Sequence, residues 1–289
     1  MLEGLACAAG RFGSMYRLPA WVRMRHILSV FRVCFRMKKA VIVVGIGEMG
    51  SVFARGFLRR GHPVFPVVRS VEMEALAAEV SDPELVIIAV GEKDIQSVLQ
   101  QLPAAWRDRL ILLQNELLPS DWIQHDLDPT VISVWFEKKK GMDSKVIIPS
   151  PVYGTHAQQV ADALDAIDIA TRVLKNNDEL LFELVLKNVY ILTTNIAGLE
   201  VGGNVGELWS QHQAVAREVA GEIISLQEKL SGQSLDAEAL INGMVDAFNG
   251  DLEHGCMGRS APARLERALK LADEHGLELS KLKQIAQKI

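Results

Sequence analysis

The sequence predicts an α/β protein in which a doubly wound parallel sheet is followed by a second, all-helical C-terminal domain. Three observations predict this fold class. Short β-branched runs alternate with amphipathic stretches from Met37 to Leu174, a glycine-rich loop follows the first run, and the strand signal stops after Leu174. The chain has 289 residues, of which 49% are hydrophobic, so its length and composition suit about two domains with buried cores.

Five apolar runs in the first part of the chain are each typical of a buried parallel strand. Helical candidates at 49–60, 71–79 and 93–101 lie between them, which is the βαβ pattern. Pro66 is unusual in a central strand because it has no N–H, so we expect a bulge or an irregular strand there. The five runs are "AVIVVG" (40–45), "PVFPVV" (63–68), "LVIIAV" (85–90), "LILLQN" (110–115) and "TVISVW" (130–135). Two more strand candidates, "KVIIPS" (145–150) and "DIATRVL" (168–174), flank an amphipathic helix at "AQQVADALDA" (157–166).

The second part of the chain reads as helices only. The segment 176–200 begins with asparagine and aspartate, which are good N-cap residues, and is apolar on nearly all faces. We therefore predict a long helix buried in a second domain, followed by helices at 211–230, 236–250 and 262–276. The predicted domains are a dinucleotide-binding Rossmann domain at 37–174 and a helical substrate or dimerisation domain at 175–289.

Residues 1–36 form a basic N-terminal extension with six arginines and one acid, Glu3. The arginines interrupt every apolar stretch, so no transmembrane helix is predicted there. An extended or misassigned N-terminus is favoured, since Met37 directly precedes the first strand. A targeting sequence and a membrane-surface amphipathic segment are the weaker alternatives.

The remainder of the chain carries a formal charge of −10, which gives no bulk attraction for nucleic acid. Cys7, Cys34 and Cys256 lie far apart and show no metal-ligand spacing. We therefore predict no structural metal and a reducing, cytoplasmic location.

The glycine-rich loop has the G-x-G-x-x-G spacing between a strand and a helix. The first glycine allows a tight turn, the second permits close approach of a pyrophosphate, and the third lets the helix pack on the strand. The pyrophosphate would lie at the helix N-terminus. The predicted cofactor-binding residues of this loop are Gly45, Ile46, Gly47, Glu48, Met49 and Gly50.

Arg69 indicates which dinucleotide binds. It lies at the end of the second strand, where an NAD enzyme usually carries an acid for the ribose hydroxyls. An arginine there suits the 2'-phosphate of NADPH. The alternative is a solvated surface arginine.

Lys187 is the strongest catalytic candidate. Its helical neighbours are mostly apolar, and a lysine is rarely buried without a partner or a task. Such a lysine, with its pKa lowered by apolar surroundings, can protonate a carbonyl oxygen as hydride reaches the carbon. Thr194 and Asn195, two turns further on, are expected to line the same cleft. The alternative is a lysine whose amine reaches the surface.

Two other polar segments are assigned no function. His254 and Cys256 in "EHGC" have no third partner at a suitable spacing and are interpreted as incidental loop residues. The basic run "EKKKG" at 137–141 is interpreted as a solvated turn after a strand.

From Met37 to its end the chain resembles ketopantoate reductase and its relatives in the 6-phosphogluconate dehydrogenase superfamily. This resemblance implies Lys187 as general acid, Asn195 and Asn115 as cofactor or substrate ligands, and a small 2-oxo acid as substrate. It is carried by "GIGEMG", Arg69, Asn115 in "LLQNE", "GMDSKVIIPSPVYG", Lys187 with Asn195 eight residues later, "NVGELW" and "ADEHGLEL".

The chain departs from the family pattern at several positions. Ile191 stands where the family has a second asparagine, and Gly91, close to Lys93, stands where it has a lysine. The family's catalytic glutamate aligns with Arg259 or Ser260, neither of which can act as that carboxylate, and a serine-methionine pair before it is missing.

Two classes of function therefore remain open: an NADPH-dependent reductase of a 2-oxo acid, or an NADPH-binding relative without catalysis that serves as a sensor or partner subunit. Within the enzyme class, a hydroxyisobutyrate-type dehydrogenase is the nearest competitor, but the chain lacks its lysine-to-asparagine spacing of four. A homodimer is the expected assembly, with no nucleic acid or membrane partner.

Overall fold

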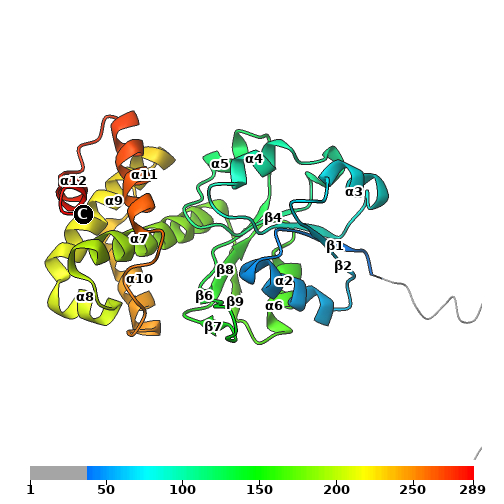
Figure 1. Cartoon of the computed structure of the whole chain (residues 1–289), viewed down its shortest axis with the longest axis horizontal. Coiled ribbons are helices and arrows are strands. Elements are labelled where there is room, and N and C mark those ends of the chain that lie inside the picture. The colour runs from blue at the N-terminus through cyan, green and yellow to red at the C-terminus, as the bar shows by residue number, and fades with distance from the viewer. Residues whose placement is uncertain (1–37) are drawn as a thin grey trace, which may run out of the picture. The chain divides into compact units, whose positions relative to one another are not determined.

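The computed structural model describes residues 38–289, so the predictions for the N-terminal extension lie outside the described residues. The described chain is built on a seven-stranded sheet with the order β2-β1-β3-β4-β5-β8-β9, followed by a group of helices (Figure 1). The strands of this sheet are β1 (Val41–Val44), β2 (Val64–Val67), β3 (Leu85–Ile88), β4 (Leu110–Leu112), β5 (Thr130–Ile132), β8 (Ser150–Tyr153) and β9 (Thr171–Val173).

The sheet is doubly wound, as predicted. Its strands pair in parallel from β2 to β5, β8 runs antiparallel to β5, and β9 pairs in parallel with β8. One apolar cluster joins the sheet to α2 and α6, and a second joins its other face to the remaining helices of this part. These helices are α2 (Glu48–Arg59), α3 (Met73–Glu79), α4 (Ile95–Gln100), the 3-10 helix η1 (Ala104–Trp106), α5 (Ser120–Ile123) and α6 (Ala157–Asp165).

The expectation of a buried strand at 63–68 is wrong, because β2 lies at the edge of the sheet. Phe65 and Pro66 are exposed there. Pro66 pairs with Val43 of β1, and its missing N–H is tolerated because an edge strand has a neighbour on one side only. No bulge is needed to place it.

The segment 145–150 does not form one strand. Lys145–Val146 (β7) pairs antiparallel with Phe136–Glu137 (β6) in a separate two-stranded hairpin, and β8 begins only at Ser150, after Pro149. This hairpin lies outside the main sheet and places residues 136–139 at the site described below.

The long helix α7 (Asn177–Val201) is the centre of the helical part. Its N-cap Asn176 accepts a hydrogen bond from the backbone N–H of Glu179 at 2.9 Å, as its sequence predicts. It is long and apolar enough to cross a membrane by length and composition, yet 78% of its most apolar window is buried inside the described structure. It packs against helices that follow it in the chain: α8 (Val205–Gln211), α9 (Gln213–Ser231), α10 (Ala237–Gly250), α11 (Ala261–Glu274) and α12 (Ser280–Ala286).

Candidate active site

A cavity of about 600 Å³ lies where the carboxyl ends of β3 and β4 meet α7 and the start of α11. Ligands of open α/β sheets bind outside the carboxyl ends of the strands, so the cavity is at the expected edge. Its lining includes five of the residues predicted for the site: Met49, Asn115, Lys187, Thr194 and Asn195.

The three glycines of the loop after β1 have different surroundings. Gly45 has φ +89°, and a Cβ there would lie 2.7 Å from the carbonyl oxygen of Ala89. A Cβ on Gly50 would lie 2.0 Å from the carbonyl oxygen of Gly45, so this glycine permits helix-on-strand packing. A Cβ on Gly47 would meet nothing within 4 Å. The space at Gly47 is therefore open to a ligand, and the fold itself does not require glycine there.

The N-terminus of α2 has no side-chain cap, because Gly47 is its N-cap residue. Its first backbone N–H groups are free to bind an anion. Within this loop, Ile46 is 40% exposed and offers an apolar surface. The loop thus combines unpaired donors, open space and an exposed aliphatic side chain, which fits the pyrophosphate and a neighbouring part of a dinucleotide.

Arg69 lies in the turn after β2, outside the lining of the cavity. The backbone N–H of Gly45 donates to the carbonyl of Val67 at 2.9 Å, so the ends of β1 and β2 are adjacent. The side chain of Arg69 is exposed and forms no ion pair with the described residues. This position suits a guanidinium that reaches a phosphate beside the glycine loop.

Lys187 lies in the middle of α7 and is 9% exposed. Its Nζ atom lies 4.1 Å from the centre of the Trp135 ring and 5.5 Å from that of the Tyr190 ring. The pKa of Lys187 is lowered to about 7, chiefly by burial and also by the charge of Arg264, while the charge of Glu137 acts in the opposite direction. The amine is therefore poised to gain or lose a proton near neutral pH.

Asn195 lies on the same side of α7 as Lys187, two turns further along, and both line the cavity. Its Nδ2 donates to the carbonyl of Ile191 at 2.9 Å, and its Oδ1 accepts from Nη1 of Arg264 at 3.2 Å. Thr194 also lines the cavity, and its hydroxyl donates to the carbonyl of Tyr190 at 2.8 Å. The predicted grouping of these side chains is present.

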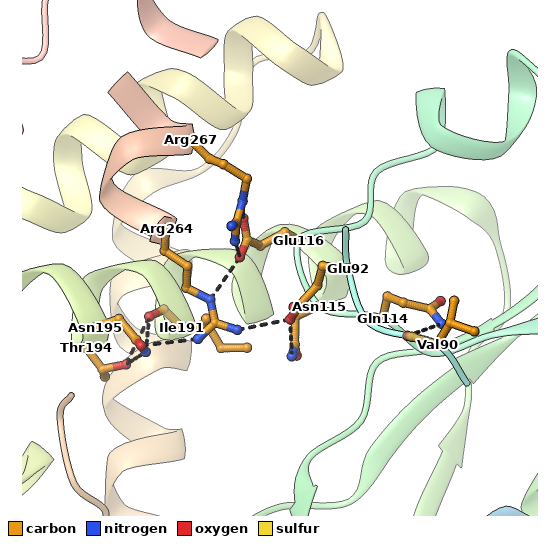
Figure 2. Close-up of polar contacts among 10 residues, drawn as sticks. All are labelled: Val90, Glu92, Gln114, Asn115, Glu116, Ile191, Thr194, Asn195, Arg264 and Arg267. Carbon is orange, nitrogen blue, oxygen red and sulfur yellow. Dashed lines mark hydrogen bonds and ion pairs between the residues drawn. The ribbon is translucent and has the colours of Figure 1, made fainter. Parts of the chain in front are cut away.

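Asn115 follows β4 and reaches the cavity from the sheet. The preceding residue, Gln114, is 8% exposed and donates to the carbonyl of Ile88 at 2.6 Å, which ties this loop to β3. The Nδ2 of Asn115 donates to Oε1 of Glu92 at 3.1 Å (Figure 2). Asn115 therefore presents its amide to the cavity from the end of β4.

A charged network at the cavity was not found from the sequence. Figure 2 shows Arg264 of α11 among Glu116, Glu92 and Asn195, with Arg267 against Glu116. Arg264 borders the cavity, whereas Arg259 and Ser260, where the family glutamate aligns, do not line it. The available signal was the position of Arg264 on its helix, next to the apolar stripe of Ala261, Leu265 and Ala268.

Glu137 and His254 also line the cavity, although the sequence interpretation left both without a role. His254 Nδ1 lies 2.6 Å from Oε1 of Glu137. Burial lowers the pKa of His254, while the Glu137 and Asp251 carboxylates oppose that shift. The solvated-turn interpretation of 137–141 is wrong for Glu137, Lys138 and Lys139. Glu137 belongs to β6, and Lys138 and Lys139 both line the cavity, with Lys138 3.5 Å from Glu48.

Cys256 is buried, and burial raises the pKa of its thiol to about 11. A thiol with that pKa is almost fully protonated at neutral pH and is a poor nucleophile. Within residues 38–289 no group of three or more histidine, cysteine, aspartate or glutamate side chains is arranged to hold a metal ion.

This architecture, a Rossmann-type sheet with a glycine loop at its carboxyl edge and a helical C-terminal part, defines the fold class of the protein. No protein-family model matches the sequence, and no curated protein matches it either. Solved structures do match, and they include several ketopantoate reductases. The chain therefore has a ketopantoate reductase-like fold.

Three of these structures illustrate the likeness. A ketopantoate reductase from Ralstonia eutropha JMP134 has a TM-score of 0.62 at 15% identity, over 86% of this chain and 96% of that one. A probable 2-dehydropantoate 2-reductase from Bacillus subtilis has a TM-score of 0.62 at 16% identity, over 86% and 98%. D-mandelate dehydrogenase, solved with NADH and anilino(oxo)acetate, has a TM-score of 0.60 at 14% identity, over 86% and 96%.

Proposed function

We propose that this protein is an NADPH-dependent oxidoreductase that reduces a small 2-oxo acid to a 2-hydroxy acid. The observation that carries the proposal is the position of Lys187. Its amine is buried beside two aromatic rings in a cavity at the carboxyl edge of the sheet, and its pKa is lowered to about 7. Perturbed ionisable groups in clefts are typical of catalytic sites.

The cofactor half of the proposal rests on the glycine loop and Arg69. The open space at Gly47 and the uncapped start of α2 fit a pyrophosphate, and the exposed Arg69 beside the loop fits the 2'-phosphate of NADPH. Ile46, Glu48 and Met49 complete the loop, and Asn115, which lines the cavity, would bind the nicotinamide end of the cofactor. When bound, NADPH supplies the hydride.

Lys187 supplies the proton in this account. Reduction of a ketone places negative charge on the carbonyl oxygen, and a positioned acid with a pKa near the working pH delivers a proton most efficiently. Asn195 would orient the substrate from the next part of the same helix face. The amine left neutral after each turnover regains its proton from solvent.

The charges of the cavity favour an anionic substrate. Four basic side chains and two carboxylates line it, so a carboxylate ligand meets more cationic than anionic groups at the cavity wall, and Arg264 is a cation at any working pH. The basic residues are Lys138, Lys139, Lys187 and Arg264, and the acids are Glu92 and Glu137.

Structural neighbours support the proposed oxidoreductase chemistry on a 2-oxo acid and suggest a homodimer. They include ketopantoate reductases, D-mandelate dehydrogenase with NADH and an oxo acid, and a dimeric ketopantoate reductase from Staphylococcus aureus. By this likeness we also propose a homodimer. Cys256, the one cysteine within residues 38–289, is a buried free thiol, which suits the reducing cytoplasm that we also propose as the location.

The test is a panel of branched, linear and aromatic 2-oxo acids incubated with the full chain and NADPH or NADH. We expect loss of NADPH absorbance with at least one acid, and formation of the matching 2-hydroxy acid carrying deuterium when deuterated NADPH is used. NADPH binding without turnover of any acid would reject the reductase and favour a binding protein without catalysis.

A further inference from the structure

We propose that Arg264 and Asn115 form the subsite for the carboxylate of the substrate, and that the side chain of Glu92 occupies this subsite until the substrate displaces it. The inference rests on the proposed function, because it takes a 2-oxo acid as the ligand. It names the residues that would bind the carboxylate of the substrate. It also adds that the Glu92 side chain occupies their subsite when no substrate is bound.

Arg264 is built into the site as an anion receptor. Its side chain is 11% exposed, and it points from α11 towards the sheet (Figure 2). Its Nε donates to Glu116 at 2.9 Å, Nη1 to Asn195 at 3.2 Å and Nη2 to Glu92 at 3.0 Å. A guanidinium has five N–H donors, so two remain on the Nη1 and Nη2 end. That end is the fork that binds a carboxylate with two hydrogen bonds.

Glu116 holds the guanidinium in place from the other side. It accepts from Nη2 of Arg267 at 2.7 Å as well as from Nε of Arg264, so two cations share this carboxylate. Glu116 has φ +64°, which is unfavourable for a residue with a side chain and is kept only where its surroundings require it. The Glu116 contact is therefore structural, and it leaves the far end of Arg264 for a second anion.

Glu92 occupies the position of that second anion. Its Oε1 atom accepts from Nη2 of Arg264 at 3.0 Å and from Nδ2 of Asn115 at 3.1 Å. Two donors from different elements thus converge on one carboxylate oxygen at the wall of the cavity (Figure 2). Recognition of a ligand carboxylate requires converging donors of this kind. Here the carboxylate of Glu92 occupies the position that a ligand carboxylate would take.

Glu92 is also the partner that can leave most easily. It lies in the loop after β3, outside any helix or strand, and its side chain is 33% exposed, against 20% for Glu116. Arg264 is its only ion-pair partner among residues 38–289. When a substrate carboxylate takes its place, Arg264 stays paired, so no buried charge is left uncompensated. Glu92 then moves to solvent.

The arrangement places the reacting carbon near the proton donor. Arg264 bonds to Asn195, which shares a helix face with Lys187, and all three line one cavity. In a 2-oxo acid the ketone is bonded directly to the carboxylate carbon. A carboxylate held by Arg264 and Asn115 therefore presents the ketone to the wall that carries Lys187.

The test is calorimetric titration of NADPH-saturated protein with oxamate, which has a carboxylate but no reducible ketone. E92Q removes the competing charge while keeping the shape, and we expect it to bind oxamate about 3- to 10-fold more tightly. R264Q should bind oxamate about 10- to 100-fold more weakly, because the charge-assisted hydrogen bonds are lost. E137Q is the matched control, since it neutralises another carboxylate of the same cavity that pairs with His254 and Lys139 and not with Arg264, and its gain should be smaller than that of E92Q.

The proposal is overturned if E92Q binds oxamate no more tightly than wild type, if E137Q gives an equal gain, or if wild type binds no oxamate. Thermal unfolding and NADPH titration check that the variants are folded. If R264Q does not fold, the oxamate affinity of E92Q tests the proposal by itself. Tighter oxamate binding by E92Q without turnover of any 2-oxo acid would reject the reductase but keep the subsite. Turnover with a KM unchanged in both E92Q and R264Q would reject the subsite but keep the reductase.

Discussion

The ammonium group of Lys187 lies 4.1 Å from the centre of the Trp135 ring, stacked on an aromatic face instead of against a carboxylate. A cation–π contact of this kind stabilises the charged form by about 0.5–2 kcal/mol, which is less than the cost of removing a lysine charge from water. The imbalance lowers the pKa of Lys187 from 10.5 to about 7. This lowered pKa is the physical basis of the proposed role of Lys187 as proton donor and of the effect of Lys187 on the stability of the protein.

The free energy of unfolding should therefore rise with pH through the Lys187 titration. Between about pH 7 and 10.5 the unfolded chain holds a proton that the folded protein lacks, so Lys187 contributes a rise of up to about 1.4 kcal/mol per pH unit. The raised pKa of Cys256 acts in the opposite direction above about pH 9, so the useful window is about pH 7 to 9. Urea unfolding of wild type and K187M measures it.

K187M removes the titrating amine and keeps an apolar side chain of similar length. We expect it to be more stable than wild type at pH 7, with an advantage that shrinks as the pH approaches 9. Comparing the two proteins cancels the contribution of Cys256, which both retain. The pKa of His254 is lowered from 6.5, chiefly by burial and in part by the charge of Lys187, so its contribution is confined to the acid end of this window. Parallel pH curves for the two proteins would mean that the amine of Lys187 titrates outside this window.

Gly47 and Gly50 separate cofactor binding from folding. Because a Cβ on Gly47 meets no atom within 4 Å, G47A should change the free energy of unfolding by less than about 1 kcal/mol. It should weaken NADPH binding about tenfold or more, since the methyl group enters the space for the pyrophosphate. G50A should instead destabilise the fold by about 1–3 kcal/mol, because its Cβ would lie 2.0 Å from the carbonyl oxygen of Gly45.

Chemical denaturation and NADPH titration of both variants provide the check. If G47A binds NADPH as tightly as wild type does, the pyrophosphate does not bind at this loop. A fully stable G50A would show that helix α2 can move away from β1 at little cost.

Arg69 should determine the preference for NADPH over NADH. Loss of its contact with the 2'-phosphate should cost about 1.5–3 kcal/mol, a roughly 10- to 150-fold loss of NADPH affinity with little change for NADH. R59A is the matched control, because Arg59 is an exposed arginine at the end of α2. Equal affinities of wild type for the two cofactors, or an equal effect of R59A, would exclude Arg69 from this role.

Elements specified by neighbouring residues could be predicted from the sequence. The β-branched runs gave the strands, and Asn176 gave the start of α7, because strand burial and helix capping depend on local pattern. The edge position of β2 could not be predicted, because strand order depends on which strands pair in space. Pro66 was the local sign of that edge, and it was interpreted as an irregularity.

The site divides in the same way. Lys187 and the glycine loop could be proposed from the sequence because each is unusual within its own segment. Arg264 was missed because its partners Glu116 and Glu92 are 148 and 172 residues away in the chain. Glu137 and His254 were missed for the same reason, since each is an ordinary polar residue until the fold brings the two to 2.6 Å.

The most direct test of the central claim is the pH dependence of NADPH oxidation in a single turnover, with the best 2-oxo acid from the panel and with wild type and K187M compared. Because the pKa of Lys187 is lowered to about 7, the wild-type rate should fall with rising pH above about 7, by up to tenfold per unit. K187M should bind NADPH normally, react about 10²- to 10⁴-fold more slowly, and show no such fall. A K187M rate and pH profile equal to those of wild type would contradict the account.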